Sequence, residues 1–226
     1  MILDYTLIRA ARKSITIYIR NGRVEVRAPV FYQDSDIEEF ILEKKKWIMD
    51  TLQKSQERLE RKNSFSLNYG DMVLYRGSNY PVVAGSGKHA EFDGTAFRIP
   101  PDLSPEQIKS ACVRLYRALA KSVLTERTYA LAEKMGVAPS VVKINNAKAR
   151  WGSCTSNKTI NYAWMLVMAD DEVIDYIIAH ELSHIYEMNH SKRFWERVGA
   201  VFPDYKERKA RLHELQERVL GENWDV

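Results

Sequence analysis

The chain has 226 residues, of which 45% are hydrophobic and 28% are charged. This composition is typical of a soluble globular protein and excludes a disordered chain, a collagen and a coiled coil. Its 34 basic and 30 acidic residues give a formal net charge of +4. Basic residues dominate one face of a dedicated nucleic-acid binder, so this even balance does not indicate a nucleic-acid partner.

Cysteine usage and hydropathy favour a cytoplasmic protein without a membrane partner. The only two cysteines, Cys112 and Cys154, form no Cys-x-x-Cys pair, which argues against a secreted disulfide scaffold and against a thiolate zinc cluster. Residues 1–15 lack the apolar core of a signal peptide. The longest apolar run, residues 162–169, is far shorter than the roughly 18 residues that a membrane helix needs.

The first elements along the chain are a hairpin and a helix. Apolar and polar residues alternate over 14–28, on both sides of Asn21-Gly22, which predicts two strands joined by a tight turn. From residue 35 the apolar residues recur at helical spacing to about Arg61, and Ser35 or Asp36 is the expected N-cap.

A β-rich stretch and a second, long helix follow. Short apolar runs punctuated by glycine over residues 65–99 predict small β-hairpins. Ser104, Pro105 and Gln107 then have the spacing of a capping box with proline at the first helical position. The apolar stripe after them predicts one long helix that ends near Gly136, with Cys112 as a small core residue of that stripe.

The last third of the chain is predicted to contain two strands and three helices. The strands, at 141–144 and 159–168, bracket a loop with the sequence Arg150-Trp151-Gly152-Ser153-Cys154. Helices are expected to begin near Asp171 and Ser191, and a charged final helix is expected over 203–219.

The second of these segments contains an H-E-x-x-H motif, His180-Glu181-Leu182-Ser183-His184. The apolar residues around it recur at helical spacing, which predicts an active-site helix from about Asp171 to Met188. Two imidazoles one helical turn apart can bind one metal ion, with the intervening carboxylate close to that ion.

His190 is the expected third ligand. A continuous helix would carry it about 9 Å past His184, so the helix has to stop and the chain has to turn back. Asn189 can adopt the left-handed conformation that ends helices, and Ser191 can cap the next helix. Three histidines with an open fourth position favour catalytic Zn²⁺; closure of that position by Cys154 is a minor alternative.

The expected chemistry is hydrolysis. Zinc lowers the pKa of a bound water to about 7, and Glu181 would take the proton of that water and deliver it to the leaving group. Arg150, Tyr205 and His213 are candidates for stabilising the transition state, and the sequence does not choose among them. Ser153 and Cys154 are poor candidates for a nucleophile, because no G-x-S-x-G elbow is present.

Several segments resemble the YgjP-like metallopeptidase family of the zincin-like group: RWGSC, NYAWMLVMADDEVIDYIIAHELSHIYEMNHSKRFW, FPDYKERKARL, and SITIYIRNGRVEVRAP with Lys46-Trp47-Ile48. The resemblance spans nearly the whole chain. It implies that His180, His184 and His190 bind zinc and that Glu181 is the catalytic base. It also implies that the strand around 159–167 borders the cleft and holds substrate by strand addition. Metzincins have glycine where Glu187 stands, so that group is disfavoured.

Together these observations predict an α+β protein. A β-rich N-terminal region with one long helix is expected over residues 1–103, and a zincin-like catalytic region with the H-E-x-x-H helix over residues 104–226. The expected function is a zinc metallopeptidase acting on peptides or proteins. Family members are also described as nucleoside triphosphate (UTP) pyrophosphatases, and Lys148, Arg150 and Lys158 could face a polyphosphate. A DNA-associated protease, suggested by the basic N-terminal hairpin, and a degenerate zincin used for binding are further alternatives.

Overall fold

A computed structural model describes residues 4–20 and 22–226 of the chain. The chain forms two compact units, Met1–Phe65 with Leu220–Asn223 and Ser66–Val219 with Trp224–Val226. The expected boundary at residues 103/104 therefore differs from the division between the units. The reason lies in packing: Tyr116 of the long helix donates its hydroxyl to the Leu74 carbonyl at 2.7 Å and its ring lies 5.0 Å from that of Phe97.

The first unit is built on a three-stranded sheet of order β1-β3-β2. Strands β2 (Thr16–Arg20) and β3 (Arg23–Pro29) are antiparallel, as the hairpin pattern predicts. Asn21 of the expected turn lies outside the described residues, and Gly22 has a φ of +73°. Strand β1 (Thr6–Ala10), which pairs in parallel with β3, was not predicted, because its residues do not alternate clearly.

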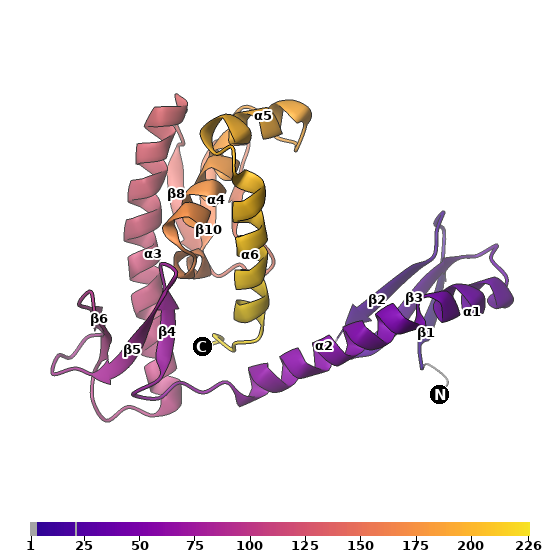
Figure 1. The fold of residues 1–226 in the computed structure, drawn as a ribbon, viewed down its shortest axis with the longest axis horizontal. Helices are drawn as coiled ribbons and strands as arrows, with labels where there is room; N and C mark the ends of the chain where they lie inside the picture. The colour runs from indigo at the N-terminus through magenta and orange to yellow at the C-terminus, as the bar shows by residue number, and fades with distance from the viewer. Residues whose placement is uncertain (1–3, 21) are drawn as a thin grey trace. The chain divides into compact units, whose positions relative to one another are not determined.

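Two helices, rather than the single expected one, pack against this sheet (Figure 1). They are α1 (Asp34–Glu43), whose N-cap is Gln33 and not Ser35 or Asp36, and α2 (Lys45–Ser64). At Lys44, ψ is 0°. Hydrogen bonds continue on both sides of this residue, from Lys44 N to Phe40 O at 3.2 Å and from Ile48 N to Lys44 O at 2.9 Å, so the break is a kink.

The second unit begins with a four-stranded sheet of order β4-β5-β7-β6. As predicted, antiparallel pairs form between β4 (Met72–Tyr75) and β5 (Ser78–Ala84) and between β6 (Glu91–Phe92) and β7 (Phe97–Ile99). Helix α3 (Pro105–Met135) follows. Its predicted capping box between Ser104 and Gln107 is confirmed, and the helix ends at Gly136 in the left-handed conformation.

A third sheet, of order β8-β10-β9, lies beside α3. Strand β10 (Thr159–Ala163) pairs in parallel with β8 (Val141–Asn145) and antiparallel with β9 (Gly152–Cys154), which forms within the expected loop. The expected strand over 159–168 is thus too long. Residues Trp164–Met168 form a buried 3₁₀ helix, η1, because a fully apolar run has no period that separates strand from helix.

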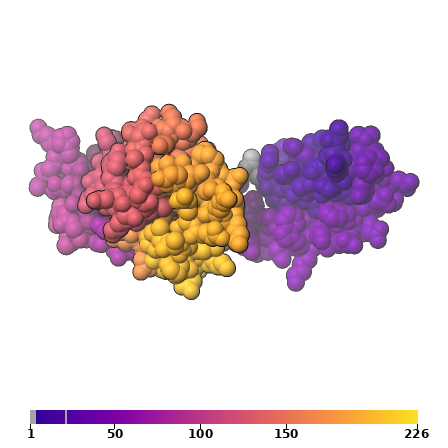
Figure 2. All heavy atoms as spheres, turned by 90° about the horizontal axis from the view of Figure 1, so that it is seen from above, coloured from indigo at the N-terminus to yellow at the C-terminus, as the bar shows by residue number. Residues whose placement is uncertain are grey.

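Three helices complete the unit: α4 (Asp171–Ser183), α5 (Lys192–Val201) and α6 (Tyr205–Leu220). Figure 1 shows α4 and α6 running alongside α3 and the third sheet. In Figure 2 the orange and yellow atoms of the C-terminal helices pack against the pink segment that contains α3 and β8. The described residues form a mixed α+β structure, in which no helix has the length and apolar character that a membrane span requires.

Candidate metal centre

The N-terminal end of α4 is fixed by its cap and by charge. Asp170 is the N-cap and accepts a hydrogen bond from Val173 N at 3.0 Å. The next residues, Asp171 and Glu172, are acidic, which stabilises the positive end of the helix dipole. The Asp170 cap and the acidic first turn therefore define where the helix that leads into the H-E-x-x-H motif begins.

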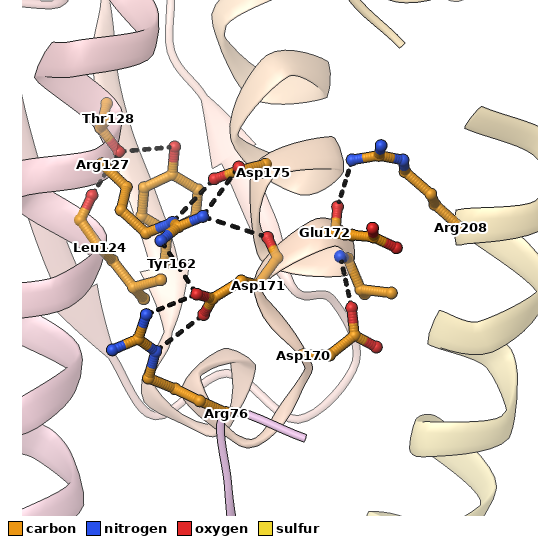
Figure 3. Close-up of polar contacts among 11 residues, drawn as sticks. Arg76, Leu124, Arg127, Thr128, Tyr162, Asp170, Asp171, Glu172, Asp175 and Arg208 are labelled. Atoms are coloured by element: carbon orange, nitrogen blue, oxygen red, sulfur yellow. Dashed lines mark hydrogen bonds and ion pairs between the residues drawn. The ribbon is translucent and has the colours of Figure 1, made fainter. Parts of the chain in front are cut away.

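Arginines from three other elements hold this acidic turn (Figure 3). From the β4–β5 turn, Arg76 Nε lies 2.7 Å from Asp171 Oδ1, and this contact lowers the pKa of Asp171. From α3, Arg127 makes two 2.8 Å hydrogen bonds to the carboxylate of Asp175. From α6, Arg208 donates to the Glu172 carbonyl at 2.9 Å.

At its other end α4 stops earlier than expected. It ends at Ser183, with His184 as C-cap, and not near Met188. The next turn is tighter, with Ile185 N bonding Leu182 O at 3.1 Å. Asn189 does not adopt the left-handed conformation that the sequence suggested. The predicted cap at Ser191 is confirmed: its side chain accepts from Phe194 N at 3.2 Å.

This early stop brings three histidines together. One ring nitrogen from each of His180, His184 and His190 lies within 4.8 Å of the others. The Nε2 atoms of His180 and His190 are 3.1 Å apart. Two donors that share one zinc, each at roughly 2.0–2.1 Å, lie at most roughly 4.2 Å apart. The measured separation is therefore one that a shared ion allows.

The hydrogen bonds and charge states of the imidazoles also suit a metal. The Nδ1 atom of His184 lies 2.9 Å from the Glu187 carbonyl; a carbonyl only accepts, so Nδ1 carries the proton and Nε2 keeps its lone pair. Burial, together with the neighbouring histidines, lowers the pKa of His180 to about 3, and burial lowers that of His184. Neutral imidazole is the form that binds metal ions.

An aromatic layer supports the trio, and the sequence patterns did not predict it. The buried ring of Phe194 lies 4.8, 4.5 and 4.8 Å from those of His180, His184 and His190. The ring of Trp195 stacks on His190 at 5.7 Å. The Ser191 cap shows that a helix starts here, but it does not show that Phe194 reaches all three histidines.

Glu181 directly follows His180 in the sequence, and its side chain is buried. Its Oε2 atom is buried and has no hydrogen-bond partner among the described residues. Burial raises the pKa of Glu181 to about 8, and the positive charge of Arg150 opposes part of this rise. The unpaired carboxylate oxygen and the converging ring nitrogens of the trio together fit a site that receives a cation and a water molecule.

The other candidates from the sequence occupy different places. Arg150 is exposed but close enough to act on Glu181. The ring of Tyr205 stacks on Trp195 at 5.2 Å. His213 is exposed on α6 and is not part of the donor cluster. Cys154 is not part of it either, and burial raises the pKa of its thiol to about 11.

The expected position of the substrate strand has to be corrected. Strand β10, within the segment 159–167, is the central strand of its sheet and has a neighbour on each side. A central strand has no free backbone edge for an added strand. Within the part of the chain that the structure describes, β9 is the strand on the α4 side that keeps an unpaired edge.

Comparisons with known proteins give one family match over most of the chain and structural matches over part of it. The family model described as YgjP-like, metallopeptidase domain, matches residues 13–215. A search of curated proteins finds no match. Among solved structures, the metallopeptidase zymogen abylysin of Pyrococcus abyssi is 25% identical, with a TM-score of 0.38 over 44% of this chain and 97% of that chain. The metallopeptidase zymogen jannalysin of Methanocaldococcus jannaschii is 22% identical, with a TM-score of 0.37 over 40% of this chain and 94% of that one.

These two structural similarities are partial, and the assignment depends on the family match. That match covers both the N-terminal hairpin and the whole segment from β8 into α6. The chain therefore belongs to the YgjP-like metallopeptidase family.

Proposed function

We propose that the protein is a zinc-dependent peptidase in which His180, His184 and His190 bind the metal and Glu181 is the general acid and base. The observation that supports this most strongly is the convergence of three histidine nitrogens within 4.8 Å in a metallopeptidase family member. Nitrogen donors from three histidines, with one coordination position left open, are typical of catalytic zinc.

Each partner in this proposal has one task. When bound, a zinc ion supplies a Lewis acid that acidifies water and polarises the carbonyl under attack. Burial alone would keep Glu181 protonated, but a cation bound beside it would favour the ionised carboxylate. In that form Glu181, whose Oε2 is unpaired, accepts a proton from the attacking water and returns it to the leaving amine. Arg150 is the best placed of the three candidates to stabilise developing negative charge, because its charge already acts on Glu181.

The proposed substrate is an extended polypeptide. The free edge of β9 can add a substrate strand through backbone hydrogen bonds, which binds peptides of varied sequence. Both cysteines are free thiols, in keeping with a reducing compartment, and we propose that the enzyme acts in the cytoplasm.

The test compares two substrate classes on the same preparations. Zinc content and hydrolysis of fluorescein-labelled casein and of UTP are measured for the wild type and for Glu181→Gln. The proposal predicts about one zinc per chain in both proteins, casein cleavage by the wild type, and loss of that cleavage in the variant. Unchanged cleavage in Glu181→Gln removes Glu181 from the mechanism, and hydrolysis of UTP alone replaces the peptidase with a pyrophosphatase.

A further inference from the structure

We infer that Gly152 is a positioning residue for Glu181: the missing side chain at this place in β9 leaves the space that the Glu181 carboxyl occupies. The inference rests on the proposed role of Glu181. It assigns a task in the reaction to the glycine of the Arg150–Cys154 loop, which lies in β9 and would act on the reaction through the Glu181 carboxyl, separately from the backbone edge that β9 offers to substrate.

The space at Gly152 is filled by Glu181 itself. A Cβ atom built on Gly152 would lie 2.6 Å from Glu181 Oε1, 2.7 Å from Cγ and 2.8 Å from Cδ. Non-bonded carbon atoms approach to about 3.5–4.0 Å. A methyl group at residue 152 and the observed Glu181 side chain therefore cannot coexist.

Backbone conformation does not explain this glycine. Gly22, Gly70, Gly77, Gly94 and Gly136 have positive φ values that favour glycine, whereas Gly152 does not. Gly152 lies in a strand, opposite Tyr162 of β10, where any residue could adopt the backbone angles. The requirement for glycine at 152 comes from the side chain of Glu181.

The carboxyl is the part that would move if a side chain were added. Strand β9 is fixed to β10 through paired residues, and Trp151 O accepts from Ala163 N at 2.9 Å. Helix α4 is fixed by the Asp170 cap and its arginine contacts. Glu181, in contrast, has a carboxylate oxygen without any hydrogen bond among the described residues. The Glu181 side chain can therefore rotate away from an added methyl group more easily than β9 or α4 can move.

Displacement of the carboxyl predicts a specific kinetic effect. The change Gly152→Ala leaves the three histidines in place, so zinc content stays that of the wild type. A reacting group misplaced by about 1 Å can cost about 100-fold in rate. We expect kcat on fluorescein-labelled casein to fall about 100-fold, with KM little changed. If Gly152→Ala keeps the wild-type kcat while Glu181→Gln is inactive in the same assay, the positioning role is overturned.

A matched glycine provides the control. A Cβ at Gly87, in the loop between β5 and β6, meets no atom closer than the His89 carbonyl at 3.7 Å, and its φ is not positive. Gly87→Ala therefore keeps wild-type kcat and zinc content. An equal loss of kcat in both variants attributes the effect to alanine substitution in general and overturns the inference.

A stability cycle tests the contact without any activity or metal. Glu181→Ala removes all three atoms that the added methyl group would meet. In the metal-free protein, Gly152→Ala is expected to lower the melting temperature in the wild-type background and to lower it much less in the Glu181→Ala background. Equal shifts in the two backgrounds overturn the contact. This result is independent of the proposed function, which fails instead if Glu181→Gln stays active.

Discussion

Phe194 is the side chain through which core packing reaches all three histidines. Its ring is buried and within 5 Å of each imidazole, so it restricts their orientation by van der Waals contact. Residues that orient metal ligands affect affinity although they do not bind the metal.

Phe194→Ala should therefore weaken zinc binding as well as the fold. We expect zinc affinity to fall about 10- to 100-fold and the free energy of unfolding to fall by about 3–5 kcal/mol. Competition with a chelator measures the first quantity and urea unfolding the second. Phe194→Leu, which keeps most of the volume, should lie between the two proteins; unchanged affinity in Phe194→Ala would show that the ring has no role in ligand orientation.

Cys154 is the thiol nearest to the proposed catalytic carboxyl, and it is expected to be dispensable. Its pKa is raised to about 11 by burial, with the charge of Glu181 adding to the rise, so it is a neutral thiol at pH 7 and a poor nucleophile. Cys154→Ser should retain most of the hydrolysis of labelled casein and the full zinc content. Loss of all activity with zinc still bound contradicts this assignment.

At the scale of elements, arginines from other elements hold α4 in place through hydrogen bonds and ion pairs. The helix carries His180 and Glu181 near its C-terminal end and has His184 as its C-cap, while its N-terminal end is held by residues from the β4–β5 turn, α3 and α6. Anchors of this kind position a site at a distance, because a helix moves as a rigid body.

The Arg127 anchor gives a stability prediction. Arg127→Met leaves the Asp175 carboxylate, which is only 28% exposed, without its bidentate partner. We expect a loss of about 1–3 kcal/mol in the free energy of unfolding. The control is Lys192→Met, whose pair with Glu196 spans 3.7 Å with a lysine side chain that is 92% exposed; it should cost at most about 0.5 kcal/mol. If urea unfolding shows the same loss of unfolding free energy in Arg127→Met and in Lys192→Met, Arg127 does not anchor α4.

The Arg76 anchor gives a pH prediction. Arg76 and Arg127 hold the pKa of Asp171 below its ordinary value of about 3.9. The ionised carboxylate therefore adds stability that is complete above that value and is lost as the pH falls through the lower, folded-state pKa. The side chain is 40% exposed, so the gain is expected to be below about 1 kcal/mol.

Asp171→Asn tests the sign of this effect. Between about pH 5 and 7, which lies above the ordinary pKa of Asp, the deficit in unfolding free energy relative to the wild type should be constant. The deficit should shrink toward lower pH. Urea unfolding across this range measures it. A deficit that grows on acidification has the opposite sign and contradicts the assignment.

Over the whole molecule, the sequence predicted the features that depend on local signals. The capping residues Ser104 and Ser191 follow from short-range hydrogen bonding, and the spacing of the three histidines indicated that they converge. The kink at Lys44, the 3₁₀ helix η1 and the early end of α4 were missed. Each of these changes backbone angles over a few residues in response to packing, which hydrophobic periodicity does not encode.

The parts of the site that sequence reasoning missed are contacts between distant elements. Phe194 reaches the trio only because α5 turns back over α4, and Gly152 meets Glu181 only because β9 forms within what the sequence predicted to be a loop. A glycine in a loop suggests a turn. The contact of Gly152 with Glu181 depends on α4 packing against β9, and these elements are distant in sequence.

The central claim is that three imidazoles bind one zinc ion, and X-ray absorption at the zinc edge tests it most directly. The wild type should show nitrogen donors at roughly 2.0–2.1 Å, with an imidazole count of three that falls to two in His190→Ala. A sulfur donor at roughly 2.3 Å, or a spectrum that His190→Ala leaves unchanged, would contradict the proposed site.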